Sequence, residues 1–181
     1  MNTALGAIRQ NGFVVADLDD AIRNWTDRLG IGPFFRIAEQ PLVGFTHRGA
    51  PSEARIAVAL AQSGGIQIEL IQPLDEHPSA FAEYRRTSGV GLQHVAHWTQ
   101  EFDQAVALVR ARGLRLVQSG RSGSGGPDER FAYFEVPGST APIVEISETR
   151  GRKAALFAAV AAASEDWDGA DPVRDMAELL R

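Results

Sequence analysis

The sequence predicts an α+β protein made of two β-α-β-β-β modules and a C-terminal helical tail. Three observations lead to this fold class: a weak internal repeat, short segments of strand-like character, and helix-end signals at matching places in both copies. We expect each copy to supply one strand, one helix and three further strands.

The repeat appears when DLDDAI at residues 17–22 is laid over EFDQAV at residues 101–106. Acidic, apolar and alanine positions coincide, with Asp19 over Asp103 and Ala21 over Ala105. Both copies then run to an arginine-containing segment and a glycine, which together signal the end of a helix. We therefore expect two copies of one supersecondary unit.

The first module begins with a strand expected over residues 8–16. Asp17 or Asp19 can cap the helix that follows, and Gly30 with Gly32-Pro33 ends it. Apolar residues recur through this segment at helical spacing. They are Leu18, Ile22, Trp25 and Leu29. The module continues with strands expected over residues 34–39, 54–61 and 65–72, of which the last two form a hairpin.

The second module repeats this order. We expect a strand over residues 93–99, a helix over 102–112, and strands over 114–119, 130–136 and 142–147. A short helix around residues 79–86 links the modules, and the alanine-rich segment 153–163 begins a helical tail that ends in a last helical segment. The expected divisions of the chain are the first module at 1–73, the linker helix at 74–90, the second module at 91–150 and the C-terminal helical extension at 151–181.

Composition and charge narrow the class of protein. The 181 residues are 44% hydrophobic and 23% charged, which is typical of a globular chain. The net charge of −5 argues against nucleic acid or an anionic membrane as a partner. The absence of cysteine excludes disulfides and thiolate metal sites. Without an apolar leader or a long apolar run, we expect a soluble cytoplasmic protein.

Two further features have ordinary interpretations. The glycine-rich segment 120–130 lacks the lysine and hydroxyl pair of a phosphate-binding loop, and we interpret it as a mobile loop that could cover a site. His47 and His77 stand in segments rich in glycine and proline, where a surface position is expected.

Four segments carry a resemblance to a known family. They are DLDDAI after a strand, IQIELIQPL at residues 66–74, GVGLQHVAH at residues 89–97 and PIVEIS at residues 142–147. Their order over roughly residues 7–148 resembles the vicinal oxygen chelate superfamily, which includes glyoxalase I, methylmalonyl-CoA epimerase, extradiol dioxygenases and bleomycin-resistance proteins. The linker between ELIQPL and GVGLQH looks most like the epimerase branch.

The resemblance implies a half-open barrel around a divalent metal ion, with ligands from the first and last strand of each module. These positions fall on Gln10, Glu69, His94 and Glu145. Many relatives carry histidine where this chain has Gln10. Carboxylate, imidazole and amide groups suit Zn, Co, Ni, Mn or Mg.

The residues themselves allow other interpretations. Glu69 and Glu145 stand in apolar strands, where a buried carboxylate is costly unless it is paired or bound to metal, yet alternation could also turn each to solvent. His94 could be a structural histidine. Three residues further, His97 points to the opposite face of the strand and is not expected to be a ligand. Trp98 shares the face of His94, and with Tyr133 it is expected to line a substrate pocket.

Such a site predicts a divalent-metal-dependent isomerase, epimerase or lyase that acts on a small carbonyl substrate, including a thioester, through a metal-stabilised enolate. By the resemblance, Glu145, or else Glu69, carries the proton. Glu53 is the candidate for a separate catalytic glutamate. We also expect a homodimer. Two alternatives stay open: a metal-free binding protein of the bleomycin-resistance type, and an extradiol dioxygenase, which would need two histidines and one carboxylate.

Overall fold

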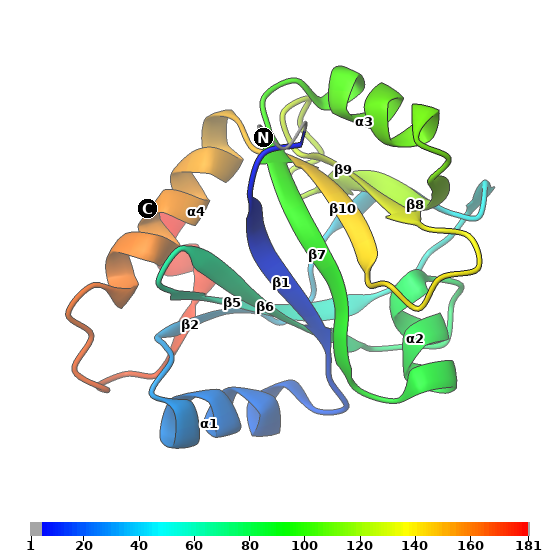
Figure 1. Cartoon of the computed structure of the whole chain (residues 1–181). Coiled ribbons are helices and arrows are strands. Elements are labelled where there is room, and N and C mark those ends of the chain that lie inside the picture. The colour runs from blue at the N-terminus through cyan, green and yellow to red at the C-terminus, as the bar shows by residue number, and fades with distance from the viewer. Residues whose placement is uncertain (1–4, 181) are drawn as a thin grey trace.

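The computed structural model describes residues 5–180, so the outer bounds expected at residues 1 and 181 lie outside the described part. Within it, eleven strands form one mixed sheet and four α-helices pack around it, which confirms the α+β class (Figure 1). The helices are α1 (Leu18–Leu29), α2 (Ala80–Ser88), α3 (Phe102–Ala111) and α4 (Gly151–Ser164). The strands are β1 (Ile8–Val14), β2 (Phe34–Ile37), β3 (Leu42–His47), β4 (Ala50–Pro51), β5 (Ile56–Ser63), β6 (Ile66–Pro73), β7 (Gly91–Thr99), β8 (Arg115–Ser122), β9 (Arg130–Glu135), β10 (Ile143–Glu148) and β11 (Val173–Asp175).

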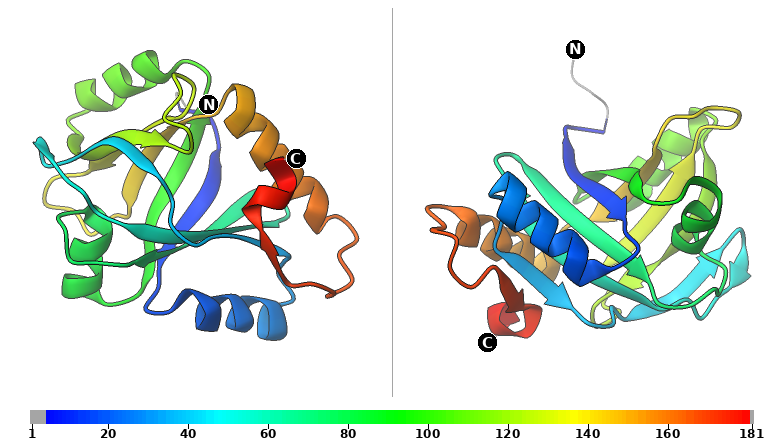
Figure 2. Two further views of the ribbon diagram at one scale, coloured as in Figure 1. Left: turned by 180° about the vertical axis from the view of Figure 1, so that it is seen from behind. Right: turned by 90° about the horizontal axis from the view of Figure 1, so that it is seen from below.

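The sheet has two halves that share the same internal order. One half runs β1-β6-β5-β2 and the other runs β7-β10-β9-β8. They meet at the antiparallel pair β1–β7, which crosses the middle of the molecule in Figure 1. Figure 2 shows the halves diverging from this shared pair. The strands that come first and last along the chain in each half, β1 and β6 in one and β7 and β10 in the other, therefore lie together at the centre.

Helix α1 shows why the first module folds as expected. The Asp17 side chain accepts a hydrogen bond from the Asp20 N–H, which caps the helix start, and Gly30 adopts φ 64° at its end. Leu18 and Ile22 are buried against the sheet, whereas Leu29 is 60% exposed. The apolar pattern therefore extends one turn beyond the face that packs.

Two short pairings extend the sheet beyond the expected strands. Strand β3, in a segment for which no strand was expected, crosses to the second half and pairs antiparallel with β8. Strand β11, where only a helical tail was expected, pairs in parallel with β2. The tail then ends in a 3-10 helix, η1 (Met176–Leu180). Each half thus gains a strand from a distant part of the chain.

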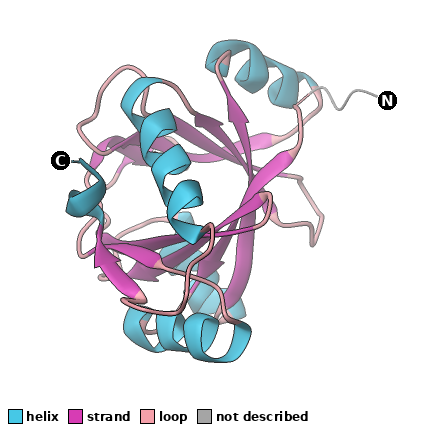
Figure 3. Ribbon diagram, turned by 90° about the vertical axis from the view of Figure 1, so that its left-hand side faces the viewer, coloured by secondary structure: helices cyan, strands magenta, loops and turns pink. Residues whose placement is uncertain are grey.

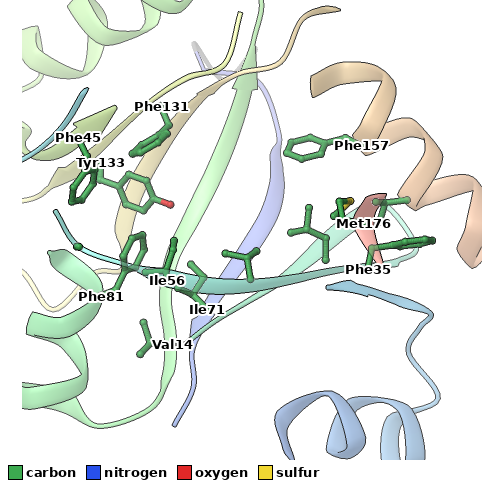
Figure 4. Close-up of a cluster of buried hydrophobic side chains, with 14 residues drawn as sticks. Val14, Phe35, Phe45, Ile56, Ile71, Phe81, Phe131, Tyr133, Phe157 and Met176 are labelled. Carbon is green, nitrogen blue, oxygen red and sulfur yellow. The ribbon is translucent and has the colours of Figure 1, made fainter. Parts of the chain in front are cut away.

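The C-terminal tail covers one side of the space between the two halves. Helix α4 lies across this side in Figure 3, between strands of the upper and lower halves. Phe157 and Val160 of this helix, with Met176 of η1, belong to the largest buried apolar cluster, which also includes Phe35, Ile56 and Phe131 (Figure 4). The tail is therefore part of the core. Among residues 5–180, no helix is both long and apolar enough to cross a membrane.

Candidate metal centre

A cavity of about 490 Å³ lies between the two halves of the sheet and the C-terminal tail. Most of its wall is apolar, and its polar groups come from the central strands β1, β6 and β10 as well as from β9, α4 and the loops around them. The apolar wall includes Ile37, Leu42, Ile56, Val58, Leu60, Ile71, Phe81, Phe131, Leu156, Phe157 and Met176. The polar wall includes Gln10, Glu69, Glu129, Tyr133, Glu145, Ser147 and Lys153. A small molecule with one polar end and one apolar end fits this distribution.

Glu69, His94 and Glu145 come together from three strands, β6, β7 and β10. The two carboxylates line the cavity, and His94 is fully buried beside them. The Nε2 atom of His94 lies 3.3 Å from Oε2 of Glu69 and 3.2 Å from Oε2 of Glu145. The side chains are 0% exposed for His94, 16% for Glu69 and 7% for Glu145. Neither carboxylate lies on the solvent face, although alternation alone allowed it.

Strand pairing explains why the ring of His94 can reach both carboxylates. Gly12 of β1 lies opposite His94 and is also the register partner of Glu69. A Cβ atom at Gly12 would overlap the imidazole ring. The absence of a side chain at Gly12 therefore leaves the space that the His94 ring occupies, between the two halves of the sheet.

The second ring nitrogen of His94 is held by its neighbour in sequence. Nδ1 lies 2.7 Å from Oε1 of Gln93, which can only accept a hydrogen bond. The amide nitrogen of Gln93 in turn donates to the backbone carbonyl of Ala80 in α2, at 3.5 Å. Donation from Nδ1 leaves Nε2 as the atom that faces the carboxylates, which is the arrangement of a histidine metal ligand.

The charges of this cluster are strongly coupled. Burial would lower the pKa of His94, but the neighbouring carboxylates of Glu145 and Glu69 outweigh burial and raise the pKa to about 9. Burial would raise the pKa of Glu145, but the His94 hydrogen bond and charge outweigh it and lower that pKa. Burial and the two carboxylates raise the pKa of Tyr133 well above its usual value. The carboxylates therefore favour the positively charged form of His94.

Gln10, the fourth expected ligand, lines the same cavity and is 2% exposed. Its amide nitrogen donates to Oε1 of Gln67, its partner in register, at 2.8 Å. The carbonyl oxygen of Gln10 is not used by this bond. This oxygen is the Gln10 atom that could bind a metal, and the hydrogen bond to Gln67 leaves it available.

The structure separates the two expected pocket residues. Tyr133 lies in the cavity wall, with its hydroxyl 3.4 Å from Nε2 of His94 and directed toward the interior in Figure 4. Trp98 lies outside that wall: its ring packs against Phe157 at 4.7 Å and lines a separate hollow. Phe157 of α4 stands between the cavity and Trp98, because it lines both.

Other expected positions also differ. His47 is in strand β3, not in a loop, and its side chain is only 10% exposed beside Glu83, so the surface position expected for it is wrong. Glu53 is exposed and outside the cavity wall. Ser122, Gly123, Ser124 and Glu129 bring the glycine-rich segment to the cavity wall.

Lys153 is the residue that sequence reasoning missed. It is buried, it lies in the cavity wall, and its Nζ donates to Oγ of Ser147 at 2.7 Å. A signal was present in the sequence, because Lys153 is the only lysine in the chain.

The residues present fit a divalent cation. The three ligand atoms of Glu69, His94 and Glu145 lie within 4.8 Å of one another. In the described part of the chain, Oε2 of Glu69 is buried without a hydrogen-bond partner. Two carboxylates would balance the charge of one divalent ion, and a buried carboxylate oxygen without a donor is costly unless a cation meets it.

Comparisons with known proteins show which chains this one is similar to. The sequence profile of the Glyoxalase/Bleomycin resistance protein/Dioxygenase superfamily matches residues 9–133. A curated protein of Bacillus subtilis (strain 168), the uncharacterized protein YqjC, is 26% identical over 143 residues, which are 77% of this chain and 90% of that protein.

Solved structures point the same way. A methylmalonyl-CoA epimerase from Mycobacterium tuberculosis is 27% identical, with a TM-score of 0.57 over 82% of this chain and 91% of that one. A Streptomyces coelicolor methylmalonyl-CoA epimerase in complex with 2-nitronate-propionyl-CoA is 20% identical, with a TM-score of 0.54 over 77% and 94% of the two chains. At that identity the second likeness speaks for the fold alone.

Proposed function

Because the chain belongs to the glyoxalase/bleomycin resistance protein/dioxygenase superfamily, we propose that it is a divalent-metal-dependent enzyme of the isomerase, epimerase or lyase kind. Its substrate is a small carbonyl compound, and the reaction passes through an enolate. The observation that carries the proposal is the meeting of Glu69, His94 and Glu145 at the wall of a largely apolar cavity.

The proposed metal ligands are Glu69, His94 and Glu145, with Gln10 as the fourth. A bound divalent ion would polarise the substrate carbonyl and acidify the neighbouring C–H group. Gln93 holds His94 in the tautomer that presents Nε2. The apolar wall around the site excludes water from the substrate, which strengthens the electrostatic interactions at the polar end.

The two carboxylates are also the proposed proton carriers. Glu145 comes from the second half of the sheet and Glu69 from the first, so they approach the cavity from different sides. An epimerase must remove a proton from one face of a carbon atom and return one to the other face. We assign the first transfer to Glu145, which a bound ion would hold as a carboxylate. Glu69, whose side chain is 16% exposed and can take up a proton from water, returns a proton to the opposite face.

The likeness to methylmalonyl-CoA epimerases favours epimerisation over the lyase reaction. The Mycobacterium tuberculosis enzyme is similar along most of both chains. By that likeness a CoA thioester is one candidate for the carbonyl substrate here.

A metal-free binding protein is the second candidate function. The observation that favours it is the extent of the apolar wall, which could hold a drug or metabolite without any reaction. An extradiol dioxygenase fits less well, because it would need two histidines and one carboxylate, whereas this cluster has one histidine and two carboxylates.

Elemental analysis of the purified protein tests the metal site. We expect about one divalent ion per chain, and its loss in Glu69→Ala and His94→Ala. His97→Ala is the matched control, because His97 is on the same strand but outside the cluster. Ligand binding that is unchanged in the two cluster variants, without any metal, would support the binding protein instead.

Proton exchange tests the reaction. Metal-loaded protein should exchange the α-proton of a carbonyl substrate with deuterated water, as measured by proton NMR on methylmalonyl-CoA and on small 2-oxo acids. Bound metal without exchange on any of these compounds would refute the enolate reaction.

A further inference from the structure

Lys153 is an unusual residue for this chain. It is the single lysine among 18 lysine and arginine residues. It lies in the first turn of α4, beyond the residues that the superfamily profile matches, and it is buried in the cavity wall. The other 17 of these residues are arginines, so the only lysine ammonium group of the chain lies in the cavity wall.

The position of Lys153 relates it directly to the proposed centre. Its Nζ donates to Oγ of Ser147, which lies two residues after Glu145 on β10. Residues two apart on a strand face the same side, so Ser147 and Glu145 point to the same cavity. The Phe157 ring lies below the ammonium group, with its centroid 5.7 Å from Nζ.

The ammonium group has no close counter-charge in the described part of the chain. No ion pair within 4.0 Å involves its Nζ there. Nearby carboxylates have other partners: Glu148 accepts two hydrogen bonds from Arg130, and Glu129 accepts from Ser124 and from the Gly126 N–H. A buried ammonium group with a single neutral acceptor is incompletely satisfied, since it can donate three hydrogen bonds.

Charge balance in the cavity shows what could complete it. Among the other charged residues of the wall, Arg36 and Arg152 balance Glu129 and Asp175 in number. Glu69 and Glu145 together balance one divalent ion, which leaves the positive charge of Lys153 in excess. Burial lowers the pKa of Lys153, and the carboxylates of Glu145 and Glu69 oppose this effect. An anionic group of a bound molecule, placed beside Nζ, would restore the balance.

We infer that Lys153 binds a free carboxylate of the substrate, so that the site selects carbonyl compounds that carry both a carboxylate and a small apolar group. This inference rests on the proposed function, because it adds a second anchor to the same site. The carbonyl group lies at the Glu69–His94–Glu145 end, the carboxylate lies at Nζ of Lys153, and the apolar group lies against Leu156, Phe157 and Met176. The carboxylate can belong to a free oxo acid or to an acyl thioester.

Binding of matched acid and neutral probes tests the inference. The first pair is 4-methyl-2-oxopentanoate and its methyl ester, and the second pair is methylmalonyl-CoA and propionyl-CoA, which lacks the carboxylate. Calorimetry measures the affinity of each of these four probes for the cobalt-loaded wild-type protein and for cobalt-loaded Lys153→Met. We expect the variant to lose at least about tenfold in affinity for the acid of one pair, as for a lost charge-assisted hydrogen bond, with the neutral probe unchanged.

The variants include two controls. Lys153→Arg should keep part of the affinity for the acid, since it keeps the charge. Arg150→Met removes a positive charge just before α4 from an exposed side chain outside the cavity wall, and should change neither affinity. The pair that responds identifies the source of the carboxylate. Equal losses for acid and neutral probes, unchanged acid binding, or binding of none of the four probes would overturn the inference.

A second measurement does not depend on a variant that folds. Lysine labelled with ¹³C at Cε gives one signal in this protein, because the chain has one lysine. That signal should shift when the acid is added and stay in place when its neutral partner is added. The same titration also separates the anion site from the metal enzyme. If elemental analysis finds that the protein binds no metal and the acid still shifts the signal, Lys153 remains the anion site and the metal enzyme is rejected.

Discussion

Gln10 and His94 occupy equivalent positions on the first strands of the two halves, but their surroundings differ. The register partner of His94 on β10 is Ile143, whose side chain cannot form a hydrogen bond. The His94 ring is therefore free to contact Glu69 and Glu145. The register partner of Gln10 on β6 is Gln67, which accepts a hydrogen bond from the Gln10 amide.

This difference shows how a duplicated unit can produce an unequal site. His94 is held by Gln93, its neighbour in sequence, and already contacts both carboxylates. Gln10 is held by a residue on another strand, and no hydrogen bond to either carboxylate is found for it among the described residues. Each half supplies one carboxylate, Glu69 or Glu145, and we expect His94 to contribute more to metal binding than its counterpart Gln10.

The largest expected effect comes from removing one member of this pair. His94→Ala should weaken metal binding by more than about 100-fold, because it removes a proposed ligand and not merely a group that orients one. Gln10→Ala should weaken it by about tenfold or less, since a neutral amide is a weaker ligand. Cobalt titration followed by optical absorption measures both. Equal losses in the two variants would contradict the unequal roles, and thermal unfolding checks that each variant is folded.

The next effect is the dependence of metal binding on pH. The pKa of His94, about 9, lies above its usual value of 6.5, so the proton stabilises the metal-free fold fully below about pH 6.5 and less as the pH rises through 9. A metal must displace this proton, and its affinity should rise by about 50-fold between pH 7 and pH 9. Calorimetry in two buffers of different ionisation enthalpy should detect about one proton released at pH 7. A flat affinity over this range would show that His94 does not bind the metal.

A smaller effect is expected at the point where the halves meet. Gly12→Ala places a methyl group where the His94 ring lies, so the ring must move from the carboxylates. We expect metal affinity to fall by about tenfold and the free energy of unfolding to fall by about 1–3 kcal/mol. Gly65→Ala is a useful control, because a Cβ atom there meets nothing within 4 Å. Unchanged metal affinity in Gly12→Ala would mean that the ring has room in another orientation.

The smallest effect tests what holds Gln10. Gln67→Ile places an isoleucine where the other half has Ile143, so the two halves become alike at this position. Without its acceptor, the Gln10 amide can rotate, and we expect metal affinity to fall by a few-fold, about the effect of one neutral hydrogen bond. Metal titration of Gln67→Ile in the Gln10→Ala background should then show no further loss. A further loss there would mean that Gln67 acts by another route.

Much of this site could be anticipated because it depends on local pattern and on the repeat. Glu69 and Glu145 each follow an apolar alternation that strand pairing preserves, and His94 stands where the repeat aligns it with Gln10. The helices follow from their caps, as the Asp17 side chain and Gly30 illustrate. These features are set by residues close in sequence.

What the sequence did not reveal depends on partners far away along the chain. Strand β3 contains a glycine and pairs only with β4 and with β8 of the other half, so its segment has no local strand signal. Lys153 stands in an alanine-rich helix, and only the packing of α4 on the sheet turns its amine to the cavity. Trp98 has the expected strand parity, but Phe157 lies between it and the cavity, because the tail folds back over the sheet.

The crossing of β3 and the return of β11 also bear on how the protein meets copies of itself. Strands β2, of four residues, and β8, of eight residues, would otherwise expose unpaired backbone groups at the two ends of the sheet, where another chain could add a strand. Instead the sheet ends in β4, which has two residues, and in β11, which has three. Such short ends are poor templates for strand addition and aggregation. A homodimer of this chain would therefore associate through side-chain surfaces of helices and loops, and not by joining two sheets into one.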